Sequence, residues 1–227
     1  SNMSLKINKG ENIAIVGENG AGKTTAIKLL CGLYYPIQGD ILINGKSSRD
    51  FSSDSYFDLF SVVFQDYNFL PMTIAENICT TSDYDKEKLY SAFEKSGIID
   101  KIKNLDKKEN TLMVKDVYKE AADFSGGEKQ KLLLAKAIYK NASVLILDEP
   151  TAALDPIAEH EIYGRFNSFV ENKTAIYISH RLSSCVFCSR IAVFDNARLA
   201  ETGTHSQLLE NKGKYSELWN AQAQYYI

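Results

Sequence analysis

The residues from Gly17 to Thr25 combine glycine, lysine and threonine in an order that suits the binding of phosphate groups. Gly22, Lys23 and Thr24 stand where the phosphate-binding loop pattern requires them, between an apolar run and a helical repeat. Successive N–H groups at a helix N-terminus supply positive potential, the Lys23 ammonium would reach the β- and γ-phosphates, and the Thr24 hydroxyl would bind Mg²⁺. An ordinary Gly-rich turn is the alternative, which the complete match disfavours. We therefore expect the nucleoside triphosphate to contact Gly17, Glu18, Asn19, Gly20, Ala21, Gly22, Lys23, Thr24 and Thr25.

Two adjacent carboxylates follow a second apolar run. Val144 to Asp148 reads as a buried strand that delivers the Asp148 carboxylate toward the Mg²⁺ region. Glu149 comes next, where a general base could polarise water for attack on the γ-phosphate. Hydrolysis is therefore favoured over binding alone.

A second Gly-containing turn opens another helix. Phe124 and Ser125 are followed by Gly126, Gly127 and Glu128, and then by an apolar-periodic stretch. This turn is a further potential phosphate cradle. One nucleotide does not need two cradles, so one of them would serve a nucleotide held by another copy.

The elements that must position these residues alternate between strands and helices. Leu5 and Ile7 alternate with polar neighbours and predict a first strand; further strands are predicted at 13–16, 41–43, 60–64, 144–147, 175–178 and 191–194. Helical spacing covers most of 73–139 and 206–225. We predict an α/β fold, a P-loop NTPase core with a mainly parallel central sheet and a small antiparallel β portion. The core would span 1–72 and 141–227, and an inserted helical subdomain about 73–140.

Composition restricts the function classes. The formal net charge of −3 gives no basic excess, so no nucleic-acid partner is expected. Apolar stretches are too short for a transmembrane helix, which needs roughly 20 residues. The four cysteines are scattered, and the single Cys-x-x-Cys pair, Cys185 and Cys188, lacks a second pair, so we expect structural thiols.

Six motifs in order resemble those of the nucleotide-binding domain of ATP-binding cassette (ABC) transporters, over essentially the whole chain. Gly17 to Thr25 matches the Walker A loop and Val144 to Glu149 the Walker B strand with its glutamate. The others are the Q-loop at Gln65, the signature Ser125-Gly126-Gly127, the D-loop at Ala152 to Asp155 and the switch histidine His180. The segments Thr73–Ile78, Ser179–Leu182 and Gly203–His205 resemble exporter-type cassettes.

The resemblance implies that two cassettes pair head to tail and enclose two ATP molecules, each between the Walker A loop of one copy and the signature, with Glu128, of the other. Thr24 and Gln65 would contact Mg²⁺, and Asp148 would act near it through water. Glu149 would be the general base. His180 would bind the γ-phosphate, Asp155 would lie at the dimer interface, and Gln65 would respond to transmembrane domains.

Three features depart from the family pattern. Phe124 and Glu128 replace the usual Leu and Gln of the signature, and Glu128 adds a negative charge that could weaken closure on ATP. The stretch Lys115 to Asp123 contains no glycine where exporters usually have one. The chain also starts too close to the Walker A loop to include the aromatic residue on which the family stacks adenine, so we expect a fragment of a longer membrane transporter.

These observations predict an ATP-binding and ATP-hydrolysing domain that powers export at the cytoplasmic face of the cell membrane, using ATP and Mg²⁺. Its expected partners are a second ABC domain, in a homodimer or heterodimer, and transmembrane domains fused upstream. The alternatives are a stand-alone ABC ATPase with separate membrane subunits and a soluble ABC ATPase of chromosome maintenance, repair or translation. A switch that binds ATP without turnover is disfavoured by Glu149 and His180.

Overall fold

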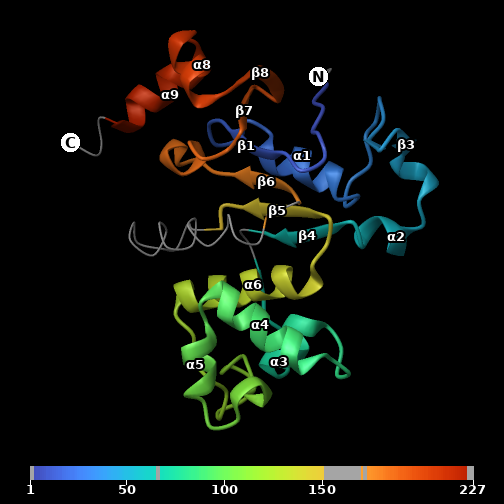
Figure 1. Cartoon of the computed structure of the whole chain (residues 1–227), viewed down its shortest axis with the longest axis vertical. Helices are drawn as coiled ribbons and strands as arrows, with labels where there is room; N and C mark the ends of the chain where they lie inside the picture. The colour runs from blue at the N-terminus through green and yellow to red at the C-terminus, as the bar shows by residue number, and fades with distance from the viewer. Residues whose placement is uncertain (1–2, 65–66, 151–169, 171–172, 224–227) are drawn as a thin grey trace. The chain divides into compact units, whose positions relative to one another are not determined.

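The structure is a computed structural model and describes residues 3–64, 67–150, 170 and 173–223. The chain forms two compact units (Figure 1). Unit 1 comprises Ser1–Phe60, Ala142–Glu149 and Asn172–Ile227. Unit 2 comprises Ser61–Asn141 and Pro150–Glu171.

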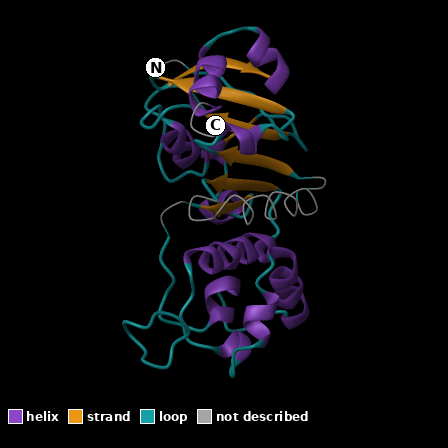
Figure 2. Cartoon of the chain, turned by 90° about the vertical axis from the view of Figure 1, so that its left-hand side faces the viewer, coloured by secondary structure: helices purple, strands orange, loops and turns teal. Residues whose placement is uncertain are grey.

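A six-stranded sheet with the order β4-β5-β6-β1-β7-β8 is the framework of the predicted phosphate loop and of Asp148 and Glu149. Pairing is parallel between β5 and β6, β6 and β1, and β1 and β7, whereas β8 runs antiparallel to β7. Figure 2 shows the strands in orange. The strands are β1 (Asn12–Val16), β4 (Phe60–Val63), β5 (Val144–Asp148), β6 (Thr174–Ile178), β7 (Arg190–Asp195) and β8 (Arg198–Gly203). The predicted α/β fold with a mainly parallel sheet is confirmed.

The central strand β1 shows why these residues form a parallel sheet. Ile13, Ala14, Ile15 and Val16 are each at most 2% exposed, as expected for a strand covered on both faces. A separate antiparallel hairpin joins β2 (Leu42–Ile43) and β3 (Lys46–Ser47). Its turn, Asn44-Gly45, has positive φ at both residues, which matches the strand twist.

The first predicted strand was wrong. Residues 5–7 form no strand, and the Lys6 carbonyl accepts a hydrogen bond from the Arg190 guanidinium at 2.5 Å. That backbone acceptor is therefore engaged by a side chain instead of a strand ladder. Strand β8 was not predicted at all.

The other elements of unit 1 are mostly short helices. Helix α1 (Lys23–Leu30) follows β1 directly, as the phosphate-loop pattern requires. The remainder are η1 (Ser48–Asp50), α2 (Ser53–Phe57), η3 (Leu182–Cys185), α8 (His205–Glu210) and α9 (Lys214–Ala223). Within the described part of the chain, no helix is long and apolar enough to cross a membrane.

Unit 2 contains helices packed on a shared apolar cluster (Figure 1). They are α3 (Ile74–Cys79), α4 (Lys86–Ser96), α5 (Ile99–Lys103) and α6 (Gly126–Lys140). The short helix η2 (Lys108–Asn110) also belongs to this unit. Leu89 and Phe93 of α4 are fully buried against Leu132 of α6. A capping box between Thr73 and Glu76 begins α3.

The four cysteines are buried and none forms a disulfide. Burial raises the pKa of the Cys31 thiol to about 12, which leaves it protonated and unreactive at neutral pH. In the described ranges, no group of three or more His, Cys, Asp or Glu is arranged to hold a metal ion. The thiols therefore pack as small apolar side chains.

Glu109 is a buried carboxylate in unit 2 that depends on two partners. It is 2% exposed, accepts a hydrogen bond from the Tyr90 hydroxyl at 2.5 Å and pairs with the Lys86 ammonium at 2.6 Å. Burial raises the pKa of Glu109, but the bonds from Lys86 and Tyr90 outweigh it, so the net pKa lies below 4.5. The ionised form is thus favoured in the folded unit.

Replacing Tyr90 by Phe is expected to lower the free energy of unfolding by about 1 kcal/mol at neutral pH, because a buried carboxylate loses a donor. The pKa of Glu109 is lower in the folded state than its ordinary value of 4.5. The stability that the ionised Glu109 contributes is therefore complete above pH 4.5 and is lost as the pH falls through the pKa of the folded state. Urea titration followed by circular dichroism should show the difference shrinking in acid. Tyr35→Phe, at a side chain 78% exposed, is the matched control. A Tyr90→Phe effect that does not exceed the control would contradict the role of the pair.

Candidate functional site

Three neighbouring parallel strands of unit 1 end at one edge of the sheet. The register places Ile178 of β6 beside Asp148 of β5 and beside Ile15 of β1. The segments that begin at Gly17, Glu149 and Ser179 therefore leave the sheet together. Ligands of open α/β sheets bind at this carboxyl edge.

The phosphate loop requires glycine at its first position. A Cβ on Gly17 would lie 2.2 Å from the Phe194 carbonyl oxygen of β7, so a side chain cannot be accommodated. Gly22 caps α1 with φ of 95°, a left-handed conformation that glycine adopts without strain. Glu18 and Asn19 between them are exposed. The middle of the loop is thus open to solvent, and its last residues begin a helix.

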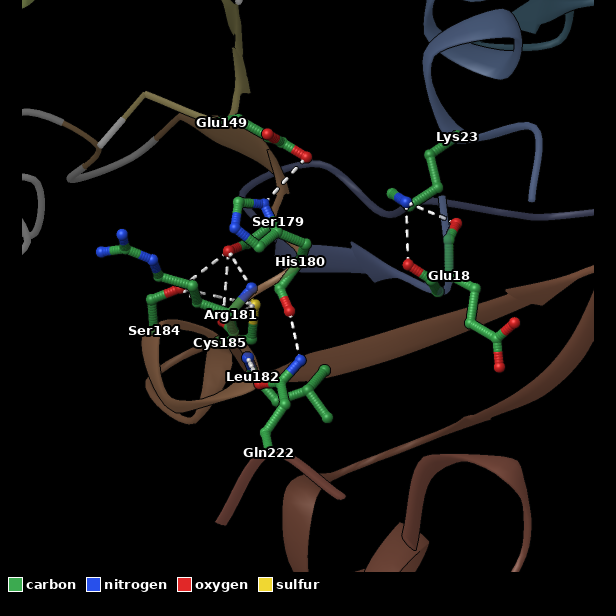
Figure 3. Close-up of polar contacts among 11 residues, drawn as sticks. Glu18, Lys23, Glu149, Ser179, His180, Arg181, Leu182, Ser184, Cys185 and Gln222 are labelled. Atoms are coloured by element: carbon green, nitrogen blue, oxygen red, sulfur yellow. Dashed lines mark hydrogen bonds and ion pairs between the residues drawn. The ribbon is translucent and has the colours of Figure 1, made fainter. Parts of the chain in front are cut away.

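Lys23 of this loop is a buried cation. It is 7% exposed, and its Nζ donates to the carbonyl oxygens of Gly17 at 2.8 Å and Glu18 at 2.9 Å (Figure 3). Burial lowers the pKa of Lys23, and the negative charges of Glu149 and Asp148 act in the opposite direction. The two carbonyl oxygens therefore fix the position of the Lys23 ammonium within the loop.

Asp148 ends β5 as a buried carboxylate, 2% exposed. Burial, and then the charge of Glu149, raises its pKa, while a hydrogen bond with Thr24 and the charge of Lys23 partly offset the rise. The Thr24 hydroxyl and the Asp148 carboxylate are thus neighbouring oxygen donors. Mg²⁺ prefers oxygen ligands, so this donor set fits the ion.

Glu149 turns the chain at the end of β5. Its φ of 49° is left-handed, an uncommon conformation for a residue with a side chain, and its N–H donates to the Ile178 carbonyl at 3.0 Å. The Glu149 Oε1 lies 3.1 Å from the His180 Nδ1 (Figure 3). The Glu149 side chain is 12% exposed and that of His180 45%. Strained backbone of this kind clusters at functional sites.

Serine hydroxyls and a distant glutamine hold the loop that carries His180. Ser179 Oγ accepts from the Arg181 N–H at 2.9 Å and lies 3.0 Å from Ser184 Oγ. Gln222 of α9 accepts from the Leu182 N–H at 2.9 Å and donates to the His180 carbonyl (Figure 3). The backbone on both sides of Arg181, directly after the histidine, is therefore bonded.

The signature turn lies in unit 2 at the start of α6. Ser125 and Glu128 form a capping box, in which Glu128 Oε2 accepts from the Ser125 N–H at 2.8 Å. Glu128 Oε1 is 3.2 Å from the Lys101 ammonium. Burial raises the pKa of Glu128, but the bonds from Ser125 and Lys101 lower it overall. The added charge of Glu128 is thus engaged locally, while Ser125 and Gly126 are exposed.

Gln65 and Asp155, with the rest of the predicted D-loop, lie outside the described residues. In unit 1 the structure brings together the phosphate loop, Asp148, Glu149 and His180. Sequence reasoning missed Gln222 and the Lys101 partner of Glu128, because neither belongs to a local motif.

The chain matches the protein family described as ABC transporter over residues 1–152. The subtilin transport ATP-binding protein of Bacillus subtilis is 38% identical over 221 residues, which cover 95% of this chain and 36% of that protein. The mitochondrial iron–sulfur clusters transporter ABCB7 of Oryzias latipes is 36% identical over 222 residues, 97% of this chain and 29% of the relative. This chain therefore spans about a third of the length of these relatives.

A solved structure of a bacterial Atm1-family ABC exporter with ATP bound is also similar. It superposes with a TM-score of 0.90 at 34% identity, over 97% of this chain and 38% of the exporter. The family match covers well over half of the chain and extends from the phosphate loop through the Walker B carboxylates. The chain therefore belongs to the ABC transporter family, as an ATP-binding ATPase domain related to those of exporters.

Proposed function

We propose that this chain powers export across a membrane as one ABC ATPase domain, residues 1–227 with a helical subdomain at about 73–140, by closing head to tail with a second cassette around ATP. The observation that carries the proposal is the shared sheet edge, where Lys23, Asp148 and the Glu149–His180 pair meet the phosphate loop. A buried ammonium, oxygen donors and a base candidate are thus assembled for phosphoryl chemistry.

ATP would be held first by the loop from Gly17 to Thr25. Backbone N–H groups at the start of α1 and the Lys23 ammonium would offset the charge of the phosphates. Thr24, Asp148 and Gln65 would hold Mg²⁺, which when bound neutralises charge on the phosphate oxygens. These groups orient the triphosphate and leave its terminal phosphate at the sheet edge.

Hydrolysis would then use the Glu149–His180 pair. The Glu149 carboxylate, 12% exposed, would accept a proton from the attacking water. His180, 3.1 Å away, would bind the terminal phosphate and keep the carboxylate aimed. Since the pair already lies within contact distance, little rearrangement is required for these roles.

The signature turn would complete the site of another copy. Ser125 and Gly126 are exposed at the N-terminus of a 15-residue helix, which can accept the phosphates of ATP bound to the partner cassette. Asp155 would lie at the same interface. Closure on ATP and opening after hydrolysis would drive transmembrane domains fused upstream, at the cytoplasmic face of the cell membrane.

Glu149→Gln is expected to reduce ATP turnover by about 100-fold or more, because the amide keeps the shape of the side chain but cannot act as a general base. ATP remains bound, so a closed dimer should accumulate. Phosphate release and light scattering in Mg-ATP, on the protein with its upstream segment, would measure both effects.

The matched control is Glu210→Gln, at an exposed carboxylate on α8, which should behave as wild type. If Glu149→Gln hydrolysed ATP at the wild-type rate, Glu149 would not be the general base. A variant that hydrolyses slowly yet stays monomeric in Mg-ATP would rule out closure around ATP.

Lys101→Met is expected to weaken ATP-dependent dimerisation about two- to fivefold, because the Glu128 charge at the signature loses its counter-charge. Both side chains are partly exposed, 36% and 28%, which limits the effect. In a Glu128→Gln background the same change should have no effect. Sedimentation at several ATP concentrations would give the four dimer constants.

Lys103→Met, on the exposed side of the same helix, controls for loss of a lysine from α5. An equal effect of Lys101→Met in both backgrounds would show that Lys101 acts independently of Glu128.

A further inference from the structure

Helix α9 is firmly fixed at its N-terminal end. The Glu201 carboxylate of β8 accepts hydrogen bonds from the backbone N–H groups of Lys214 and, at 3.5 Å, Tyr215. The Tyr215 side chain is fully buried, and its hydroxyl lies 2.8 Å from the His205 Nδ1. Trp219, one turn further, packs its ring against His205. The helix is therefore a rigid support.

Gln222 lies near the other end of this helix and contacts the switch loop. Its Oε1 accepts from the Leu182 N–H at 2.9 Å, and its Nε2 donates to the His180 carbonyl. Figure 3 shows the Gln222 side chain extending to the backbone on both sides of Arg181. One amide thus uses both its donor and its acceptor on the segment that bears the histidine.

Other polar contacts of this segment come from β1, from Glu149 and from its own serines. Ser179 and Ser184 are bonded to each other and to the Arg181 backbone, which shapes the loop but links it to no separate helix. Gln222 is 42 residues from His180 and ties the loop to α9. The orientation of the His180 ring toward Glu149 therefore depends on where α9 holds the backbone.

A second contact of α9 reaches the phosphate loop but is weaker. The Lys214 ammonium lies 2.8 Å from the Glu18 carboxylate, yet the Glu18 side chain is 58% exposed. Exposed ion pairs contribute little. Of the two contacts, the Gln222 amide, with its two hydrogen bonds, is the one that fixes the backbone beside His180.

We infer that Gln222 is a positioning residue for the switch histidine: it fixes the backbone at His180 and so keeps the imidazole in contact with Glu149. The inference rests on the proposed role of His180 in hydrolysis. It makes α9 a part of the catalytic support, although none of its side chains need touch ATP.

The test is the rate of ATP hydrolysis by the full-length protein, measured as kcat and KM and under single-turnover conditions that resolve slow rates. Gln222→Ala is expected to lower kcat by about tenfold, less than the roughly 100-fold that a 1 Å displacement can cost. KM for ATP should stay within about twofold, because the phosphate loop is untouched. Gln222→Glu, which keeps the size but sets a carboxylate against the His180 carbonyl, should show the same loss.

The matched control is Asn220→Ala, which removes an exposed amide from the same helix; Asn220 bonds only weakly to Ser216, one turn earlier, at 3.5 Å. This variant should keep wild-type kcat. If Asn220→Ala and Gln222→Ala slow turnover equally, the effect belongs to the helix and the inference is overturned. Wild-type kcat in Gln222→Ala would overturn it as well.

A double-mutant cycle with His180→Ala separates positioning from general structure. In the His180→Ala background, Gln222→Ala should cause no further loss, because the side chain to be positioned is gone. A further loss of the same factor would overturn the inference alone. Wild-type turnover in His180→Ala itself would overturn the proposed role of His180, and the inference with it.

Discussion

The parallel pairing of β5, β6 and β1 is the constraint on which the site depends. Their buried apolar side chains fix the register. This matters for the site because a shift along the sheet would move the residue at which each strand ends. With Asp148 and Ile15 both beside Ile178, the three following loops emerge at one edge. The predicted catalytic residues come from segments far apart in sequence, and this pairing brings them together.

At that edge the sheet buries charges that are costly without partners. Lys23 and Asp148 are both buried. Burial lowers the pKa of Lys23 and raises that of Asp148, so it favours the neutral form of each side chain. The mutual attraction of lysine and the carboxylates opposes both shifts, so the charged forms support one another. Such preorganised charge stabilises a transition state without the reorganisation that water would need. The charges that are costly to bury are thus the ones that a triphosphate site would need.

The sequence predicted what is local and missed what is tertiary. Apolar runs such as Ile13–Val16 predicted the parallel strands. The phosphate loop and the Asp148-Glu149 pair are each contiguous in sequence, so both could be identified as motifs. Strand β8 was missed because its half-buried positions, Leu199, Glu201 and Gly203, include a single large apolar residue, and because its turn, Asn196-Ala197, has φ of 47° and 55° without any glycine. The contact of Gln222 with the His180 loop spans 42 residues and leaves no local pattern.

The unusual signature shows how structure changes the meaning of a substitution. Taken singly, Glu128 places a negative charge where phosphates would bind. In the fold it completes a capping box with Ser125, a task that glutamine performs equally well, so the substitution alters charge and keeps the cap. Lys101 supplies the counter-charge at 3.2 Å and also lies 5.6 Å from the centre of the Phe124 ring. The two departures from the family pattern therefore share one partner, and the helix N-terminus stays available to an anion.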